Sequence, residues 1–142
     1  MNNTKTINAG WGRPGTVEHA SGKKKVARMD KIRSLSEGRN LFEEFIEQDL
    51  PILQKNFVGR ILAGNQLRSL DSICSNMEEG YERKSGKEII NFFRMSKGSA
   101  GGAKGRYKRL SKILPEEIVN KRVAVLNEIR AILSPCYSLL KF

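Results

Sequence analysis

Histidine and cysteine, the residues that most often build catalytic and metal sites, are scarce in this chain of 142 residues. His19 is the one histidine and lies in a glycine-rich segment near the N-terminus. Cys74 and Cys136 are far apart and form neither a CxxC nor a Cys/His ligand spacing, so a metal site is not expected. Neither a Glu-x-x-His nor a GxxxxGK(S/T) motif occurs. We therefore predict a protein that is not an enzyme and that needs no cofactor or metal.

Long apolar runs are also absent. No segment approaches the roughly 20 apolar residues that cross a bilayer, and residues 1–15 contain no apolar signal segment. The two cysteines fall within apolar helical patterns, which suits buried, reduced thiols in a reducing compartment. We expect a cytoplasmic protein with no membrane partner.

Acidic residues are too few to balance the basic ones. The chain has 26 Lys and Arg against 15 Asp and Glu, a net charge of +11. Such a charge creates a positive field that attracts polyanions, above all nucleic acid. The alternative is a generally basic surface with no specific partner. Because the charge is clustered along the chain, we favour a nucleic-acid partner.

Residues 1–36 hold eight basic and two acidic residues, which is more than half of the net charge in a quarter of the chain. They contain several glycines and almost no apolar periodicity, so we predict an arm that is disordered or ordered by a partner. The basic cluster Lys23, Lys24, Lys25 and Arg28 is expected to bind nucleic acid, although a solvated tail would look the same. Trp11 has no role in a mere linker, and we expect it to contact a partner.

Residues 37–142 are predicted to form an all-α, antiparallel, up-down four-helix bundle. The first helix is expected to start at Asn40, and Pro51 should kink or divide it. Its inward residues are Leu41, Phe42, Phe45, Ile46, Ile52, Leu53 and Phe57. The second helix should span residues 61–79 and end at Gly80. No segment alternates polar and apolar residues as a strand would.

The third helix should begin at Gly86, because Ser85 and Glu88 form a capping box. From residue 89 to 114 its apolar and small residues recur every three or four positions, which predicts an inward seam. Pro115 should close this helix and open the fourth, and Pro135 should kink the fourth helix late. Short connections make consecutive helices antiparallel neighbours.

Basic residues form a stripe along the third helix, with no acidic residue between Asn91 and Pro115. A stripe of one sign is typical of a surface that follows a phosphate backbone. The alternative is pairing with acidic residues of another helix or subunit, such as Glu43, Glu44, Glu47 and Asp49. The residues expected to bind nucleic acid here are Lys87, Arg94, Lys97, Lys104, Arg106, Lys108, Arg109 and Lys112, and Gly101 fills the one missing step of the stripe.

Four glycines, Gly98, Gly101, Gly102 and Gly105, are predicted to lie on the outer face of the third helix. Each costs about 0.8–1 kcal/mol relative to alanine in a helix interior. They are expected to permit close approach of a partner, either a neighbouring subunit or a nucleic-acid strand. A locally frayed helix is the alternative.

The stretch SNMEEGYERKSGKEIINFFRMSKGSAG resembles the signature region of the four-helix-bundle family of proteins encoded in 23S ribosomal RNA intervening sequences. The matching residues are Asn76, Glu79, Gly80, Arg83, Ser85, Glu88, Phe92, Gly98 and Ser99. The resemblance covers about residues 40–142. The chain departs from the family at Gly102, where an acidic residue is usual, and at Ala103, where a larger apolar residue is usual.

This resemblance implies a homopentamer. A related branch of the family comprises accessory proteins of diversity-generating retroelements, which bind a reverse transcriptase and its template RNA. The excess basic charge of this chain makes it more similar to that branch.

The function predicted from sequence is thus a non-enzymatic, oligomeric nucleic-acid-binding scaffold, with the resemblance implying an accessory subunit of a retroelement reverse transcriptase that binds template RNA or cDNA. One alternative is a protein–protein interaction module whose basic face docks an acidic partner. Another is a protein of the ribosomal-RNA intervening-sequence type, whose role is unsettled.

Overall fold

The computed structural model describes the backbone of residues 22–139 and the side chains of residues 33–134. All regular structure in this part of the chain is helical, and the predicted antiparallel four-helix bundle is confirmed. The elements are α3 (Gly22–Glu44), a π-helical turn (Phe45–Asp49), α4 (Leu50–Leu53), α5 (Phe57–Glu82), α6 (Gly86–Arg109), a 3-10 turn (Leu110–Lys112) and α7 (Glu116–Leu139).

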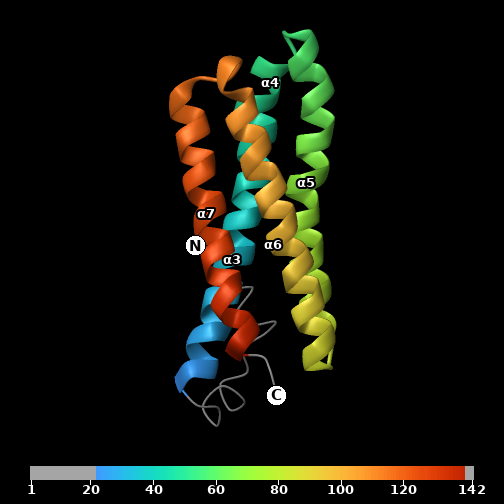
Figure 1. Cartoon of the computed structure of the whole chain (residues 1–142), viewed down its shortest axis with the longest axis vertical. Helices are drawn as coiled ribbons and strands as arrows, with labels where there is room; N and C mark the ends of the chain where they lie inside the picture. Colours follow the sequence, from blue (N-terminus) through green and yellow to red (C-terminus); the bar gives the residue numbers. More distant parts are fainter. Residues whose placement is uncertain (1–21, 140–142) are drawn as a thin grey trace.

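The long helices run alternately up and down (Figure 1). α5 contacts α6, α6 contacts α7, α7 contacts α3, and α3 contacts α5, so the four rods close around one core. The α4–α5 and α6–α7 connections lie at one end of the bundle and the α5–α6 connection at the other. Helix α6 therefore has α5 along one flank and α7 along the other.

The first helix starts earlier than predicted. α3 begins at Gly22 and passes through Asn40 without interruption, so residues 22–36 are helical and the domain boundary predicted at residue 36 lies within a helix. Leu35 is 2% exposed and belongs to the core, as do Leu41 and Phe45. Gly38 lies between Leu35 and Leu41 on the inward face of α3, against Cys74 and Met77 of α5. Because glycine has no apolar side chain, the apolar periodicity of the sequence is interrupted there. Residues 1–21, including Trp11, lie outside the described part.

The helical backbone of the first rod continues past Pro51 to Leu53, so the predicted division at Pro51 does not occur. The turn before Pro51 is π-helical, and the N–H of Leu50 donates to the carbonyl of Phe45. Pro51 then occupies the first turn of α4, where its missing N–H needs no partner. The prediction for Phe57 was wrong: it is 67% exposed and begins α5.

Gly80 is not the end of the second rod, which runs on to Glu82. Its role is close packing, since a Cβ atom there would lie 2.9 Å from Cε1 of Phe93 on α6. The predicted start of α6 is confirmed, with the Ser85 side chain accepting from the N–H of Glu88. α7 is not interrupted at Pro135.

Candidate nucleic-acid interface

The predicted inward seam of α6 is confirmed and fixes how the rest of this helix faces its neighbours. Phe93, Ala100, Ala103 and Tyr107 are all 0% exposed. Ser96, also 0% exposed, donates from its hydroxyl to the carbonyl of Ile73 on α5 at 2.8 Å. With this seam inward, residues on either side of it point toward α5 or toward α7.

The flank of α6 toward α5 is closed by hydrogen bonds. The hydroxyls of Ser99 and Ser72 lie 2.8 Å apart. The Gln66 side chain donates to the carbonyl of Ala103 at 3.0 Å, and it accepts from Nη1 of Arg106 at 2.8 Å. Polar groups on this flank thus satisfy one another and hold α5 to α6.

Arg106 belongs to this closed flank. Its Nη1 also donates to the hydroxyl of Ser69 at 2.9 Å. Burial, together with the positive charge of Arg109, lowers the pKa of Arg106. The structure therefore separates Arg106 from the basic stripe with which the sequence grouped it.

The flank of α6 toward α7 has a different character. A Cβ atom on Gly101 would lie 3.5 Å from Nε of Arg130, which extends from α7. The Nε atom of Arg130 is buried, and no hydrogen-bond acceptor among the described residues reaches it. Lys97 and Lys104, about one turn to either side of Gly101 on α6, are partly buried. A guanidinium from one helix thus lies among the lysines of another.

Sequence reasoning missed Arg130. Its position on the flank of α7 could be read from helical periodicity, but only the packing of α7 against α6 places it over Gly101. We call the cationic surface formed by Arg94, Lys97, Lys104 and Lys108 of α6, with Gly101 and with Arg130 of α7, the α6–α7 flank.

The predicted binding residues outside the flank are dispersed. Lys87, Arg109 and Lys112 are exposed, as are Arg94 and Lys108 of the flank, and Lys112 belongs to the 3-10 turn after α6. Arg94 and Lys97 also interact with other parts of the chain. Lys23, Lys24, Lys25 and Arg28 lie on α3, where the structure describes the backbone alone.

The four glycines of α6 are not equivalent. A Cβ atom on Gly98 or Gly102 would meet nothing within 4 Å, so these two face open space as predicted. Gly105 lies beside the guanidinium of Arg109, with its Cβ position 3.5 Å from Nη1. Gly101 departs from the prediction, because it faces Arg130 rather than an empty outer surface.

Acidic side chains are directed away from the α6–α7 flank. The one acidic residue of α6 is Glu88, in its first turn, and after its own first turn α7 has only Glu128. Glu128 lies on the α3 side of α7, where its carboxylate is 3.8 Å from Arg33. The middle of the flank is therefore free of acidic groups from either helix.

Two acidic residues that were alternative partners for the stripe are used elsewhere. Asp49 is 0% exposed, and its carboxylate accepts from Nε and Nη2 of Arg122 at 3.0 and 2.8 Å. Glu44 accepts from Nη1 of the same arginine at 2.7 Å. Neither carboxylate pairs with the lysines of α6.

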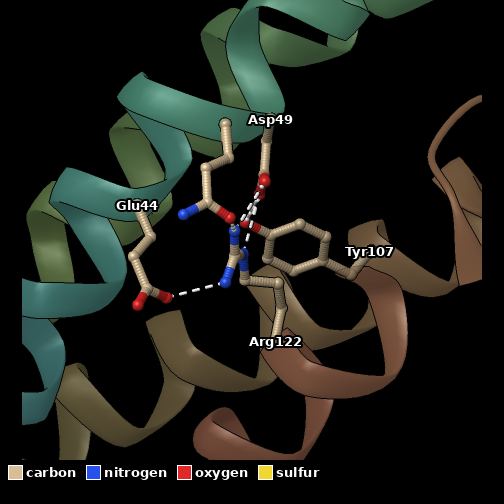
Figure 2. Close-up of polar contacts among 5 residues, drawn as sticks. Glu44, Asp49, Tyr107 and Arg122 are labelled. Carbon is tan, nitrogen blue, oxygen red and sulfur yellow. Dashed lines mark hydrogen bonds and ion pairs between the residues drawn. The ribbon is translucent and has the colours of Figure 1, made fainter. Parts of the chain in front are cut away.

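Arg122 is the centre of a polar cluster with Glu44, Gln48, Asp49 and Tyr107 (Figure 2), which we call the Arg122 cluster. Arg122, Asp49 and Tyr107 are buried, whereas Glu44 is partly exposed and Gln48 is exposed. Gln48 accepts from Nη2 of Arg122 at 3.0 Å, and the Tyr107 hydroxyl donates to Asp49 at 2.5 Å. Burial and the Asp49 carboxylate raise the pKa of Tyr107, which keeps the hydroxyl protonated. Burial lowers the pKa of Arg122, but the hydrogen bonds to Asp49 together with the charges of Asp49, Tyr107 and Glu44 outweigh this and raise it. The cluster fixes α7 against α6 and the π-helical turn.

The residues that carry the family resemblance have structural roles near the α5–α6 connection. Asn76 donates to the carbonyl and hydroxyl of Ser72. Arg83 pairs with Glu79 at 2.5 Å and stacks over the ring of Phe92 at 4.9 Å. These contacts help to hold the ends of α5 and α6 together where the two helices connect.

Comparison with known proteins identifies no relative: no family, no curated protein and no solved structure matches this chain. In the part of the chain that the structure describes, no helix is both long and apolar enough to cross a bilayer.

Proposed function

We propose that this protein is a non-enzymatic nucleic-acid-binding scaffold and that the α6–α7 flank is its principal binding surface. The observation that carries the proposal is the separation of charge. Carboxylates of Glu44, Asp49 and Glu128 pair with arginines away from this flank, whereas Lys104, Lys108 and Arg130 have no acidic partner among the described residues. Unneutralised cations in a row favour a polyanion with regularly spaced charges.

The basic residues of α3 extend this proposal. Lys23, Lys24, Lys25 and Arg28 lie in the first turns of the helix and add positive charge to the same molecule. In combination with the α6–α7 flank they would lengthen the path that a phosphate backbone can follow.

Self-association is the second part of the proposal. Phe57, Val58 and Ile61 are 67%, 50% and 54% exposed on the first turns of α5. Large apolar side chains gathered on one exposed turn favour a protein contact surface, and several copies would multiply the cationic surface. A ring of five copies and a role beside a reverse transcriptase are the forms that the family resemblance suggests.

The binding proposal is tested by fluorescence anisotropy with labelled single-stranded RNA, single-stranded DNA and duplex DNA. The test variant is Lys104→Glu with Lys108→Glu in the full chain. Each cation removed should flatten the dependence of affinity on salt, by about 0.7 in log–log slope for a single strand, and charge reversal should weaken binding further.

The matched control is Lys84→Glu with Lys121→Glu, which makes the same change in net charge at exposed positions outside the α6–α7 flank. We expect this control to keep most of the affinity. Equal losses in both variants would mean that net charge, not this flank, drives binding. Tighter binding to polyglutamate than to any nucleic acid would instead support the alternative function, docking of an acidic protein.

A further inference from the structure

Cationic residues of α6 recur once per helical turn, with one interruption. Arg94, Lys97, Lys104 and Lys108 follow the alternation of three and four residues that keeps side chains on one side of a helix. At about 1.5 Å per residue, neighbouring steps are about 4.5–6 Å apart along the axis, and the series spans about 21 Å. Gly101 stands at the position between Lys97 and Lys104 where the series would place another cation.

Arg130 occupies that step from the neighbouring helix. The three atoms nearest to a Cβ built on Gly101 all belong to its guanidinium: Nε at 3.5 Å, Cζ at 3.7 Å and Nη2 at 3.7 Å. The three distances are nearly equal, so the flat face of the guanidinium lies against α6 where a larger residue at position 101 would stand. The Nε–Nη2 edge of an arginine can bind a phosphate with two parallel hydrogen bonds.

The Nε donor is buried and has no acceptor among the described residues. A buried donor without a partner is unfavourable, by about 1–3 kcal/mol. Among the described residues, the charged neighbours of Gly101 on α6 are Lys97 and Lys104, and the nearest acidic residue of α7, Glu128, pairs with Arg33 toward α3. An anion from outside the chain would supply the missing acceptor.

We propose that Arg130 supplies the cation that α6 lacks at Gly101, and that it binds one phosphodiester group of a single nucleic-acid strand lying along the α6–α7 flank. This inference rests on the proposed nucleic-acid-binding function. The space over Gly101 lets the guanidinium turn its Nε–Nη2 edge toward the phosphate. Helices packed side by side are about 8–10 Å apart, so the surface between them follows one strand more closely than a duplex.

The first test uses Arg130→Gln and Arg130→Lys in the full chain, with labelled oligo-U and oligo-dT of twelve nucleotides. Arg130→Gln should weaken binding about tenfold, as expected for a lost hydrogen bond to a charged group, and should reduce the salt slope by about 0.7. Arg130→Lys keeps the charge and loses the two-donor edge, so it should keep the slope while losing part of the affinity. The two probes show whether the strand is RNA, DNA or either.

The second test compares Gly101→Ala with Gly102→Ala. Both changes should raise the stability of α6 by a similar amount, because both replace a helical glycine by alanine. Only the Cβ atom at position 101 fills the space beside Arg130; that at position 102 meets nothing. Gly101→Ala should therefore weaken oligonucleotide binding severalfold, whereas Gly102→Ala should not.

A direct readout is the Nε–Hε signal of Arg130 in nitrogen-15 spectra, identified by its loss in Arg130→Gln. It should shift on addition of oligo-dT. If the wild-type chain binds and Lys104→Glu weakens binding, but the Arg130 variants bind normally and the signal does not move, this inference is wrong and the proposed function stands. If the wild-type chain binds no oligonucleotide, both are overturned. A larger effect of Arg130→Gln on polyglutamate than on oligo-dT would also overturn the inference.

Discussion

Two arginines of α7, Arg122 and Arg130, lie about two helical turns apart, yet their surroundings are opposite. Arg122 is 1% exposed, and each nitrogen of its guanidinium donates to an acceptor in the Arg122 cluster. Arg130 has a buried Nε without an acceptor in the described part of the chain and stands among lysines. Arg122 has the carboxylates of Glu44 and Asp49 as partners, whereas Arg130 has no carboxylate partner among the described residues.

This contrast separates a structural arginine from one with uncommitted binding capacity. Arg122 is fully buried and Arg130 is partly buried. They differ above all in their hydrogen bonds, because every guanidinium nitrogen of Arg122 has an acceptor and Nε of Arg130 has none among the described residues. Arg122 variants should therefore change stability, and Arg130 variants should change binding.

The largest expected effect is on stability at the Arg122 cluster. Arg122→Met leaves the Asp49 carboxylate buried without a charged partner, which should lower the free energy of unfolding by about 3–5 kcal/mol. Urea denaturation, monitored by circular dichroism, measures this loss of stability. Lys121→Met, at the exposed position beside it, is the control and should change stability by no more than about 0.5 kcal/mol. A loss below about 1 kcal/mol for Arg122→Met would contradict the structural role.

Two glycines of α5, Gly80 and Gly64, can likewise be compared as a close-packed and an open position. Gly80→Ala places a methyl group 2.9 Å from Phe93, so overpacking should cost about 1–3 kcal/mol. Gly64→Ala, on the same helix α5, meets nothing within 4 Å and should stabilise the protein by about 0.8–1 kcal/mol. Thermal denaturation of the two variants should therefore give shifts of opposite sign. Shifts of the same sign would show that Gly80 is not a close-packing position.

Glu37 of α3, which interacts with Glu128 of α7, should make the stability of the protein depend on pH. Burial, a hydrogen bond with Glu128 and the charge of Glu128 raise the pKa of Glu37 to about 7, against the opposing charge of Arg33. The folded protein then binds this proton more tightly than the unfolded chain, whose glutamate has its ordinary pKa of 4.5. The free energy of unfolding should consequently fall as pH rises from about 4.5 to 7. Denaturation at several pH values should show a smaller fall for Glu37→Gln, and an unchanged fall would contradict this assignment.

The smallest expected effect on stability is that of Arg130→Gln, which should change the free energy of unfolding by no more than about 0.5 kcal/mol. The same denaturation measurement applies. A loss comparable with that of Arg122→Met would mean that Arg130 holds the bundle together, and the contrast between the two arginines would fail.

Local sequence patterns predicted the four rods and the cap at Ser85, because each depends on residues close together in the chain. The start of α3 was missed because Gly38 interrupts the apolar stripe. Asp49 and Arg122 were missed for another reason: a charged residue, read within its own helix, is expected at the surface, and only packing brings the two together. Arg130 over Gly101 is likewise a contact between helices.

The central claim, that the cations of the α6–α7 flank neutralise successive phosphates, is tested most directly by the salt dependence of oligo-U and oligo-dT binding by the full chain. Lys104, Lys108 and Arg130, at about 0.7 each, predict a log–log slope of about −2, or steeper if Arg94, Lys97 and the basic residues of α3 contribute. The Lys104→Glu, Lys108→Glu variant should flatten it while the Lys84→Glu, Lys121→Glu control does not. A slope near zero, or no binding at low salt, would contradict the account.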